Sequence, residues 1–214
     1  MKIEIWSDIM CPFCYIGKRH LEKALETFSA RDQVEIEWKS YQLDPTIPMS
    51  FEKPVGVYEY LADRKGWSLE QSEQMHDRVV EMAATVGLEY NFDRAVVANS
   101  LYAHRVIQLA KQKGLDDVIE EIFFRAYFTD GRDLASVETL VELGEEAGLE
   151  APEIRAAIAS EELAYRVSQD IQEGVNLGVR GVPFFVFDRK YGISGAEPIQ
   201  VFIDTLNQTI QDAS

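Results

Sequence analysis

The chain has 214 residues, 46% of them hydrophobic, which suits one or two folded domains with a good core. Its formal net charge is −16, and no cluster of basic residues occurs along it. We therefore do not expect nucleic acid or anionic membrane surfaces as partners, because neutralising phosphates supplies most of that affinity. The sequence shows neither a secretory leader nor an apolar run of membrane-spanning length, so we expect a cytoplasmic protein.

The first part of the chain predicts a β-α-β unit. Apolar and polar residues alternate over residues 2–6 and again over 34–41, as they do in half-buried strands. Between these strands, apolar residues recur at helical spacing over residues 21–28. Three prolines and a glycine within residues 45–56 then predict a loop that leads away from the sheet.

The middle of the chain, from residue 58 to about 160, carries helical patterns only. Ser68 and Gln71 form a capping box at the start of one helix, and Gly87 is expected to end it. We therefore expect an all-helical insertion domain. Its further helices are predicted over about 93–114, 115–128 and 136–148, with a short helix after Pro152.

The methionine and aromatic side chains of this insert are expected to form its core, because such residues on amphipathic helices are usually buried. One stripe on the first long helix combines Met75 and Met82 with valines at helical spacing. The expected core positions are Met75, Met82, Tyr102, Phe123, Phe124, Tyr127 and Phe128.

The last part of the chain predicts an α-β-β-α unit. An amphipathic helix over 164–175 leads into strands over 184–187 and 190–194, and a final helix follows over 199–210. Joined to the front β-α-β unit, these elements give an α/β fold with a small mixed sheet flanked by helices. The predicted domains are 1–45 with 161–214, and the helical insertion over 46–160.

Both cysteines of the chain lie in one C-x-x-C motif, at the junction of the first strand and the first helix. The i, i+3 spacing of Cys11 and Cys14 places both sulfurs on one helix face, and Pro12 falls at the first helical position, where a missing N–H costs nothing. Free backbone N–H groups and the helix dipole there favour a thiolate at Cys11. Phe13 is uncharged and cannot donate a hydrogen bond to that sulfur. Cys11 is therefore the expected nucleophile, and Cys14 the resolving thiol.

Two plainer explanations of the cysteine pair compete with redox chemistry. Buried apolar cysteines are common, but a C-x-x-C motif directly after a strand is more typical of redox chemistry. Half of a zinc site is the other explanation, but structural zinc takes four ligands and the histidines His20, His76 and His104 form no paired motif. We therefore expect no metal.

Four stretches of the chain resemble a known family when taken together. They are residues 7–17 (SDIMCPFCYIG), 98–105 (ANSLYAHR), 128–133 (FTDGRD), and 178–183 (GVRGVP) with 194–196 (SGA). In order and spacing they resemble the thioredoxin superfamily. Within it, the chain is most similar to the DsbA-like branch, in which a helical domain interrupts a thioredoxin fold, and to cytoplasmic FrnE-type members related to 2-hydroxychromene-2-carboxylate isomerases.

The resemblance implies three features of the site. The Val182–Pro183 bond would be cis and packed opposite the C-x-x-C motif; the residues alone show only that Pro183 opens a strand, where proline is tolerated. The backbone of Val182 would then offer hydrogen-bonding groups to an extended substrate. The resemblance also places Asn99 and His104 on a helix that faces the active site, where they would contact substrate.

We therefore expect a thiol–disulfide oxidoreductase in which Cys11 attacks, Cys14 resolves and Pro183 shapes the substrate groove. Its expected partners are protein or small-molecule disulfides and thiols. No cofactor is required in this hypothesis, and glutathione stays open as a thiol co-substrate. The sequence carries no mark of the oligomeric state, the reduction potential or the physiological substrate.

Two alternatives stay open. The related isomerases and the kappa-class glutathione transferases carry a hydroxyl residue where this chain has Cys11, and they use it to stabilise a glutathione thiolate. Because a thiol can itself exchange with a disulfide, dithiol chemistry is favoured here over glutathione-dependent isomerisation or transfer on a small aromatic or polyketide substrate. The second alternative is a peptide-binding chaperone without enzymatic activity.

Overall fold

The computed structural model describes residues 1–212 of the chain, which divides into two compact units. One unit combines Met1–Leu43 with Tyr165–Ser214, and the other is Asp44–Ala164. The last two residues of the predicted domain over 161–214 lie outside the described residues. The predicted α/β fold is confirmed, since a run of helices is inserted between two strands of one mixed sheet.

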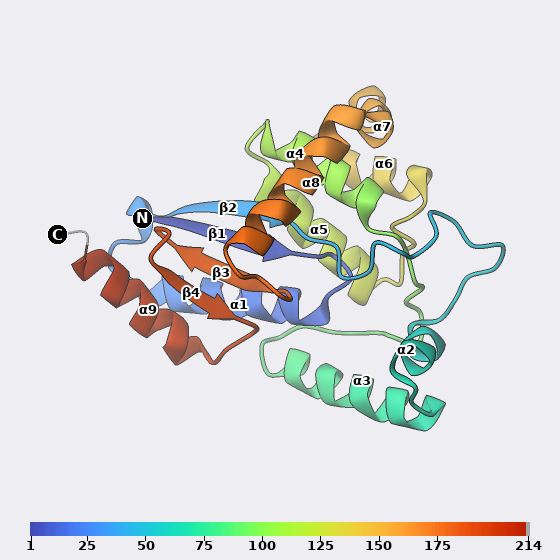
Figure 1. The fold of residues 1–214 in the computed structure, drawn as a ribbon, viewed down its shortest axis with the longest axis horizontal. Helices are drawn as coiled ribbons and strands as arrows, with labels where there is room; N and C mark the ends of the chain where they lie inside the picture. The colour runs from blue at the N-terminus through green and yellow to red at the C-terminus, as the bar shows by residue number, and fades with distance from the viewer. Residues whose placement is uncertain (213–214) are drawn as a thin grey trace. The chain divides into compact units, whose positions relative to one another are not determined.

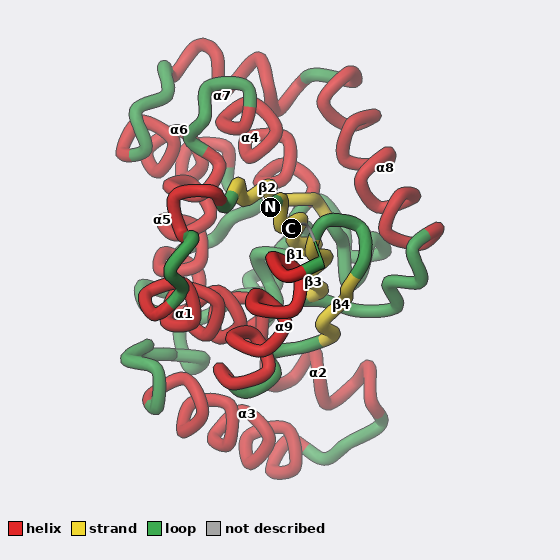
Figure 2. The backbone as a smooth tube through the Cα atoms, turned by 90° about the vertical axis from the view of Figure 1, so that its left-hand side faces the viewer, coloured by secondary structure: helices red, strands yellow, loops and turns green. Residues whose placement is uncertain are grey.

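The first unit is built on a four-stranded sheet of β1 (Lys2–Ser7), β2 (Glu35–Ser40), β3 (Phe184–Phe187) and β4 (Tyr191–Ser194). The strand order is β2-β1-β3-β4, with β1 parallel to β2 and the other pairs antiparallel. Figure 2 shows these strands gathered in one sheet. All four were predicted within one or two residues because their apolar and polar side chains alternate, or form a short apolar run, between turn signals.

Helices α1 (Pro12–Thr27) and α9 (Ile199–Gln211) pack side by side on one face of this sheet (Figure 1). Phe202 of α9 meets Phe185 of β3 edge to face, with ring centroids 4.9 Å apart. The alternation of the strands explains this layer, because every second side chain points to the same face. The fully buried residues of the strands on this face are Ile3, Ile5, Trp38, Phe185 and Phe187.

Helix α8 (Glu161–Asn176) is linked to the other face of the sheet, on which Trp6 lies. The indole Nε1 of Trp6 donates a 2.7 Å hydrogen bond to the carbonyl oxygen of Asp170. The carboxylate of Asp170 in turn accepts a 3.0 Å hydrogen bond from the backbone N–H of Ser40, at the end of β2. One residue of α8 therefore fixes the helix to two strands.

The second unit is all-helical, as predicted. Its centre is aromatic, and the phenylalanines and the tyrosine of α5 are fully or almost fully buried. The prediction is wrong for two of the expected core residues: Met75 and Met82 on α3 are 37% and 41% exposed, while Val79 beside them is buried. A third, Tyr102, is only half-buried. The helices are α2 (Val57–Lys65), α3 (Leu69–Ala84), α4 (Leu101–Lys111), α5 (Asp116–Phe128), α6 (Val137–Glu146) and α7 (Ala151–Ala159).

One predicted helix boundary is also wrong. A helix was expected from about residue 93, but α4 begins only at Leu101. Residues 92–94 form a turn instead. After it, Val97 donates a 2.8 Å hydrogen bond to the carbonyl of Val55, and Val96 forms a β-bridge with Gly56. These long-range bonds satisfy the backbone groups that a helix would otherwise pair.

Within residues 1–212, no helix combines the length and the hydropathy that a bilayer span requires.

Candidate active site

The C-x-x-C motif lies where the sequence placed it, at the start of α1. Cys11 is the N-cap residue, with extended φ and ψ of −91° and 110°, and Pro12 follows at the first helical position. The backbone N–H of Cys14 donates a 3.0 Å hydrogen bond to the carbonyl of Cys11. The first turn of the helix contains no acidic residue. A negative charge on Cys11 would therefore lie at the positive end of the helix dipole, with no opposing carboxylate on that turn.

The loop before α1 is held by Asp8, a residue that we had not selected as part of the site. Its carbonyl accepts a 2.9 Å hydrogen bond from the N–H of Cys11. Its carboxylate, 1% exposed, accepts bonds from the N–H groups of Met10 at 3.3 Å and Leu43 at 2.7 Å. An aspartate that bonds the N–H two residues on is a common turn motif, and this signal could have identified it.

Both cysteines are free thiols, and they lie close enough to hydrogen-bond to each other. Burial raises the pKa of the Cys14 thiol well above its ordinary value, and the hydrogen bond and negative charge of Cys11 raise it further. Hydrogen bonds from the backbone of Asp8 and the side chain of Ser7 act in the opposite direction and are outweighed. Cys14 therefore stays protonated while a charge rests on Cys11.

The loop before β3 supplies the second wall of the site. The Val182–Pro183 peptide bond is cis, as the resemblance implied. The thiol of Cys11 donates a 3.3 Å hydrogen bond to the carbonyl oxygen of Val182. The carbonyl of Pro183 accepts a 2.8 Å bond from the N–H of Gly195, just after β4. The loop is thus tied both to the reactive sulfur and to the sheet.

Gly17 explains how close α1 comes to this loop. A Cβ atom at this position would lie 3.0 Å from Cζ of Phe185 and 3.1 Å from Cγ of Pro183. Such contacts are tighter than ordinary van der Waals separations, so only glycine fits without movement of its neighbours. The absence of a side chain at Gly17 therefore sets the spacing between the cysteine helix and Pro183.

Exposure differs sharply within the motif. Cys11 is 3% exposed and Cys14 1%, so a bulky disulfide reaches Cys11 only when residues around it move. Phe13, between them, is 37% exposed. An exposed phenylalanine next to a reactive sulfur offers apolar contact to an incoming substrate.

Asn99 and His104 belong to the helical unit, before and on α4. The Asn99 amide donates a 2.6 Å hydrogen bond to the carbonyl of Ile47, and its oxygen accepts a 2.9 Å bond from the N–H of Leu101. Asn99 therefore has a structural role at the start of this helix. His104 is fully buried. Contact of either residue with substrate stays a prediction.

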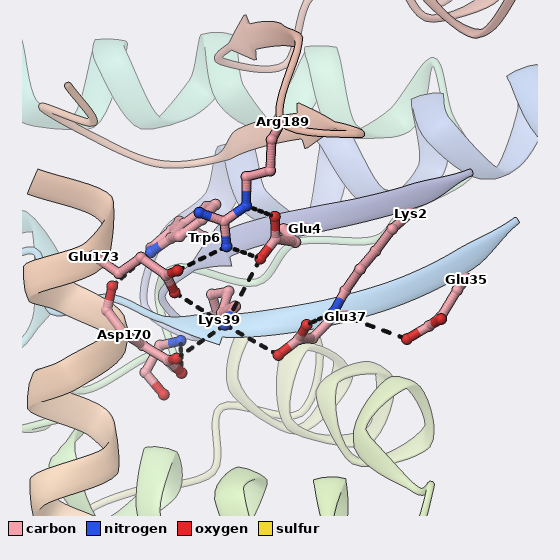
Figure 3. A network of polar contacts seen from close by, with 10 residues as sticks. Lys2, Glu4, Trp6, Glu35, Glu37, Lys39, Asp170, Glu173 and Arg189 are labelled. Atoms are coloured by element: carbon pink, nitrogen blue, oxygen red, sulfur yellow. Dashed lines mark hydrogen bonds and ion pairs between the residues drawn. The ribbon is translucent and has the colours of Figure 1, made fainter. Parts of the chain in front are cut away.

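A charged network lies on the α8 face of the sheet (Figure 3). The ammonium of Lys39 is 3.0 Å from Glu37, 3.1 Å from Glu173, 3.5 Å from Asp170 and 3.8 Å from Glu4. Burial alone would lower the pKa of Lys39, but the surrounding carboxylates raise it well above its ordinary value. Lys39 is therefore held as a cation among four acids from three elements.

Arg189 is the second cation of this network. Arg189 lies in the β3–β4 turn and pairs with both Glu4 and Glu173. It and Asp188 adopt left-handed φ angles of 55° and 46°, which are unusual for residues other than glycine. The Asp188 carboxylate accepts a 2.6 Å bond from the N–H of Lys2, which offsets the strain of this turn. No side chains of residues 1–212 form a cluster suited to a metal ion.

Comparison with known proteins identifies the family. The profile of the DSBA-like thioredoxin domain matches residues 2–207, which is nearly the whole chain. The chain belongs to the DsbA-like thioredoxin domain family. A probable DsbA oxidoreductase from Streptomyces coelicolor is 41% identical in sequence, with a TM-score of 0.93 over 99% of this chain and 90% of that one. The DsbA-like fold with a helical insertion is thereby established.

Two more distant proteins extend the comparison. YwbO of Bacillus subtilis is 28% identical over 173 residues, which cover 79% of this chain and 75% of that protein. The cytosolic disulfide reductase DsbM of Pseudomonas aeruginosa shares the fold at 18% identity, with a TM-score of 0.69 over 99% of each chain. The DsbA-like architecture is therefore kept while most of the sequence differs.

Proposed function

We propose that this DsbA-like chain is a thiol–disulfide oxidoreductase with Cys11 as its nucleophile and Cys14 as its resolving thiol. One observation carries the proposal: two free thiols lie in hydrogen-bonding range at the first turn of α1, and the outer one contacts the carbonyl of Val182. Family membership supports it, because DsbA-like domains with a C-x-x-C motif are associated with disulfide exchange.

The proposed reaction has two exchanges. The Cys11 thiolate attacks one sulfur of a substrate disulfide, a mixed disulfide forms, and the other substrate sulfur leaves as a thiolate that takes up a proton. Cys14 then loses its proton and attacks the Cys11 sulfur, which releases the second substrate thiol and leaves a Cys11–Cys14 disulfide. Two electrons pass from the protein to the substrate, and an external dithiol or two monothiols return them.

The raised pKa of Cys14 fits this order. While Cys11 is anionic, its charge keeps Cys14 protonated, so the two thiols do not compete for the same substrate. Once Cys11 enters a mixed disulfide its charge is gone, and one of the causes that raise the pKa of Cys14 is removed. Cys14 is therefore more readily deprotonated after Cys11 has formed the mixed disulfide than before.

Three neighbours are assigned supporting roles. Pro12 begins the helix at a position where its missing N–H leaves no hydrogen bond unmade, and Phe13 offers apolar contact to the substrate. The backbone of Val182, beside Pro183, is placed to hydrogen-bond an extended substrate. Because the Cys11 thiol donates to the Val182 carbonyl, a substrate N–H takes over this acceptor when the thiol becomes a mixed disulfide.

We further propose that the chain acts as a reductase in the cytoplasm, in the FrnE-type branch, with glutathione among its reductants. The fold shared with a cytosolic disulfide reductase supports the direction of electron flow. The thiol at position 11, where the related isomerases carry a hydroxyl, supports dithiol chemistry over isomerisation. A redox titration against glutathione buffers tests the direction, because a reductase requires a potential near or below that of the cytosolic pool.

Insulin reduction with dithiothreitol as the electron source tests the exchange itself. The wild-type chain is expected to accelerate reduction, and Cys11→Ser is expected to abolish the acceleration. Cys14→Ser serves as the matched control, because it keeps the nucleophile and should accumulate a mixed disulfide that mass spectrometry detects. Activity that survives in Cys11→Ser would refute the proposal.

A further inference from the structure

Arg180 lies in the loop that carries Val182 and Pro183, and neighbouring residues fix its position. Before it, Val179 is 3% exposed and packs in a cluster with Trp6, while its N–H bonds to the carbonyl of Gly174 at 2.9 Å. After it, Val182 packs against the same cluster and Pro183 is buried. Between these anchors Arg180 is exposed. The loop therefore presents this side chain to solvent.

The guanidinium of Arg180, like those of Arg31, Arg78 and Arg94, has no ion pair among residues 1–212. Among residues 1–212 its side chain forms no hydrogen bond and no ion pair, although acids outnumber basic residues by 37 to 21 in the chain. Most other arginines of the chain are paired with an acid. Those with an ion pair are Arg19, Arg64, Arg105, Arg125, Arg132, Arg155 and Arg189.

Arg180 lies in the same loop as the carbonyl that contacts the reactive sulfur. The carbonyl oxygen of Val182 is 3.3 Å from the sulfur of Cys11. Arg180 is two residues earlier, so its Cα lies at most about 7.6 Å from that of Val182. A substrate held at Cys11 along this loop would therefore lie close to the backbone of Arg180.

Gly181 keeps the surface between the two residues open. A Cβ atom built there would meet nothing within 4 Å, and its φ is not in the left-handed region. Neither packing nor backbone conformation therefore requires glycine at this position. The missing side chain leaves room beside the Val182 backbone.

We propose that Arg180 is a specificity-determining residue that selects thiols and disulfides bearing a carboxylate near the sulfur. A guanidinium binds a carboxylate through paired N–H donors, and an exposed unpaired one pays no cost of breaking an existing ion pair. In a chain of net charge −16, it also offsets repulsion of an anionic substrate. The inference rests on the proposed exchange at Cys11, which it deepens by naming a substrate class.

The exchange itself is unchanged by this selection. With 3,3′-dithiodipropionate as substrate, Cys11 attacks one sulfur, one mercaptopropionate leaves and is protonated, and Cys14 displaces the second. The protein ends as the Cys11–Cys14 disulfide and the substrate as two thiols. Arg180 touches only the carboxylate, and it takes no proton and no electron.

Three small disulfides of similar size and different charge test the inference. They are 3,3′-dithiodipropionate, which is anionic, bis(2-hydroxyethyl) disulfide, which is neutral, and cystamine, which is cationic. The reduced protein is mixed with each, quenched with acid, alkylated and weighed, which gives the rate constant for its oxidation. Arg180→Ala is expected to slow oxidation by the anionic disulfide about two- to fivefold at low salt, and to leave the neutral rate unchanged.

Two variants serve as controls. Arg180→Lys keeps the charge and should retain most of the preference for the anion. Arg31→Ala removes an exposed arginine from the turn before β2, which begins at the end of the sheet opposite Cys11, since β1 and β2 are parallel. It changes the net charge equally but should leave all three rates unchanged.

The outcomes test the exchange at Cys11 and the role of Arg180 separately. Oxidation of the wild-type protein by the neutral disulfide tests the exchange at Cys11, whatever Arg180 does. A ratio of anionic to neutral rates that Arg180→Ala leaves unchanged, or that Arg31→Ala lowers equally, overturns the role of Arg180. Glutathione disulfide and a peptide disulfide with an aspartate beside its cysteine then distinguish a small-molecule from a protein source of the carboxylate.

Discussion

The thiol of Cys11 donates its hydrogen bond to the carbonyl oxygen of Val182, across 171 positions of sequence. This bond joins the first turn of α1 to the loop before β3, two segments that the helical insertion separates along the chain. Because the donor is the reactive group itself, any shift of the loop also changes the surroundings of the sulfur. The spacing between α1 and this loop is therefore a property of the site as well as of the fold.

Gly17→Ala tests that spacing. The new methyl group would press on Pro183 and Phe185, which are both buried. Overpacking of this kind costs about 1–3 kcal/mol, and the better helix propensity of alanine offsets up to about 1 kcal/mol. We expect a net loss of about 1 kcal/mol in the free energy of unfolding, measured with urea, and slower alkylation of Cys11.

Gly181→Ala is the matched control for this prediction. Its Cβ enters open space, so its unfolding free energy should stay within about 0.5 kcal/mol of the wild type. A Gly17→Ala protein as stable as Gly181→Ala would show that the loop moves freely away from the helix.

The thiolate of Cys14 should appear only at strongly alkaline pH. Burial and the charge of Cys11 both raise its pKa well above the ordinary value. In Cys11→Ser the second cause is removed, so the pKa of Cys14 should fall, yet stay above its ordinary value because burial persists. Ultraviolet absorbance of the thiolate across a pH titration measures the pKa of Cys14 in the wild type and in Cys11→Ser. An unchanged or higher pKa in the variant would contradict the assigned coupling.

Lys39→Met should destabilise the sheet unit strongly. The substitution leaves Glu4, Glu37, Asp170 and Glu173 close together without their shared cation, and Glu4 and Asp170 are largely buried. Loss of one partner from a buried ion pair costs about 3–5 kcal/mol. Urea unfolding followed by circular dichroism measures the loss.

Lys2→Met provides the comparison for Lys39. Lys2 also pairs with Glu37, but its side chain is 44% exposed, so the pair is screened by water. The expected loss is at most about 1 kcal/mol. Equal losses in the two variants would mean that the network around Lys39 adds nothing beyond a surface ion pair.

His76 should make the helical unit sensitive to acid. Its Nδ1–H donates to the carbonyl of Ser72 at 2.8 Å, and its ring packs edge to face on Tyr58 and Phe92. Burial lowers its pKa, which the Ser72 bond and the charge of Asp77 only partly oppose. A folded-state pKa below the unfolded one means that the unfolded chain binds more protons, so stability is full above the unfolded pKa and falls as pH drops.

The test compares thermal unfolding between pH 7 and pH 5 in the wild type and in His76→Gln. Glutamine keeps a donor for Ser72 but does not titrate. The melting temperature of the wild type should fall more steeply over this range than that of the variant. Parallel curves would assign the acid sensitivity to other groups.

Local signals in the sequence were sufficient for most elements. The capping box of Ser68 and Gln71 marks the start of α3, and both of its reciprocal hydrogen bonds are present. The alternation of apolar and polar residues predicted the strands, and the position of the C-x-x-C motif predicted the start of α1. These features depend on neighbours a few residues apart, and such patterns can be read without the fold.

Features that depend on distant partners could not be predicted in this way. The helix expected from residue 93 is replaced by a turn and, after it, the bond from Val97 to Val55. Met75 and Met82 lie on the apolar side of α3 by pattern, but nothing in the pattern shows that packing covers Val79 and Val86 and leaves the two methionines exposed. Glu4, Asp170 and Glu173 around Lys39 likewise come from segments far from it in the sequence. The bond from the N–H of Leu43 to Asp8 also joins residues 35 positions apart.

The bond between Asp170 and the backbone of Ser40 has a consequence for self-association. Strand β2 is at the border of the sheet, and an unpaired border strand can recruit a strand from another molecule. Here the N–H of Ser40 is already taken by Asp170, and Lys39 and Glu37 place charges along the same strand. This border is therefore protected against strand addition, so a chain with Asp170→Ala should aggregate more readily on heating than the wild type.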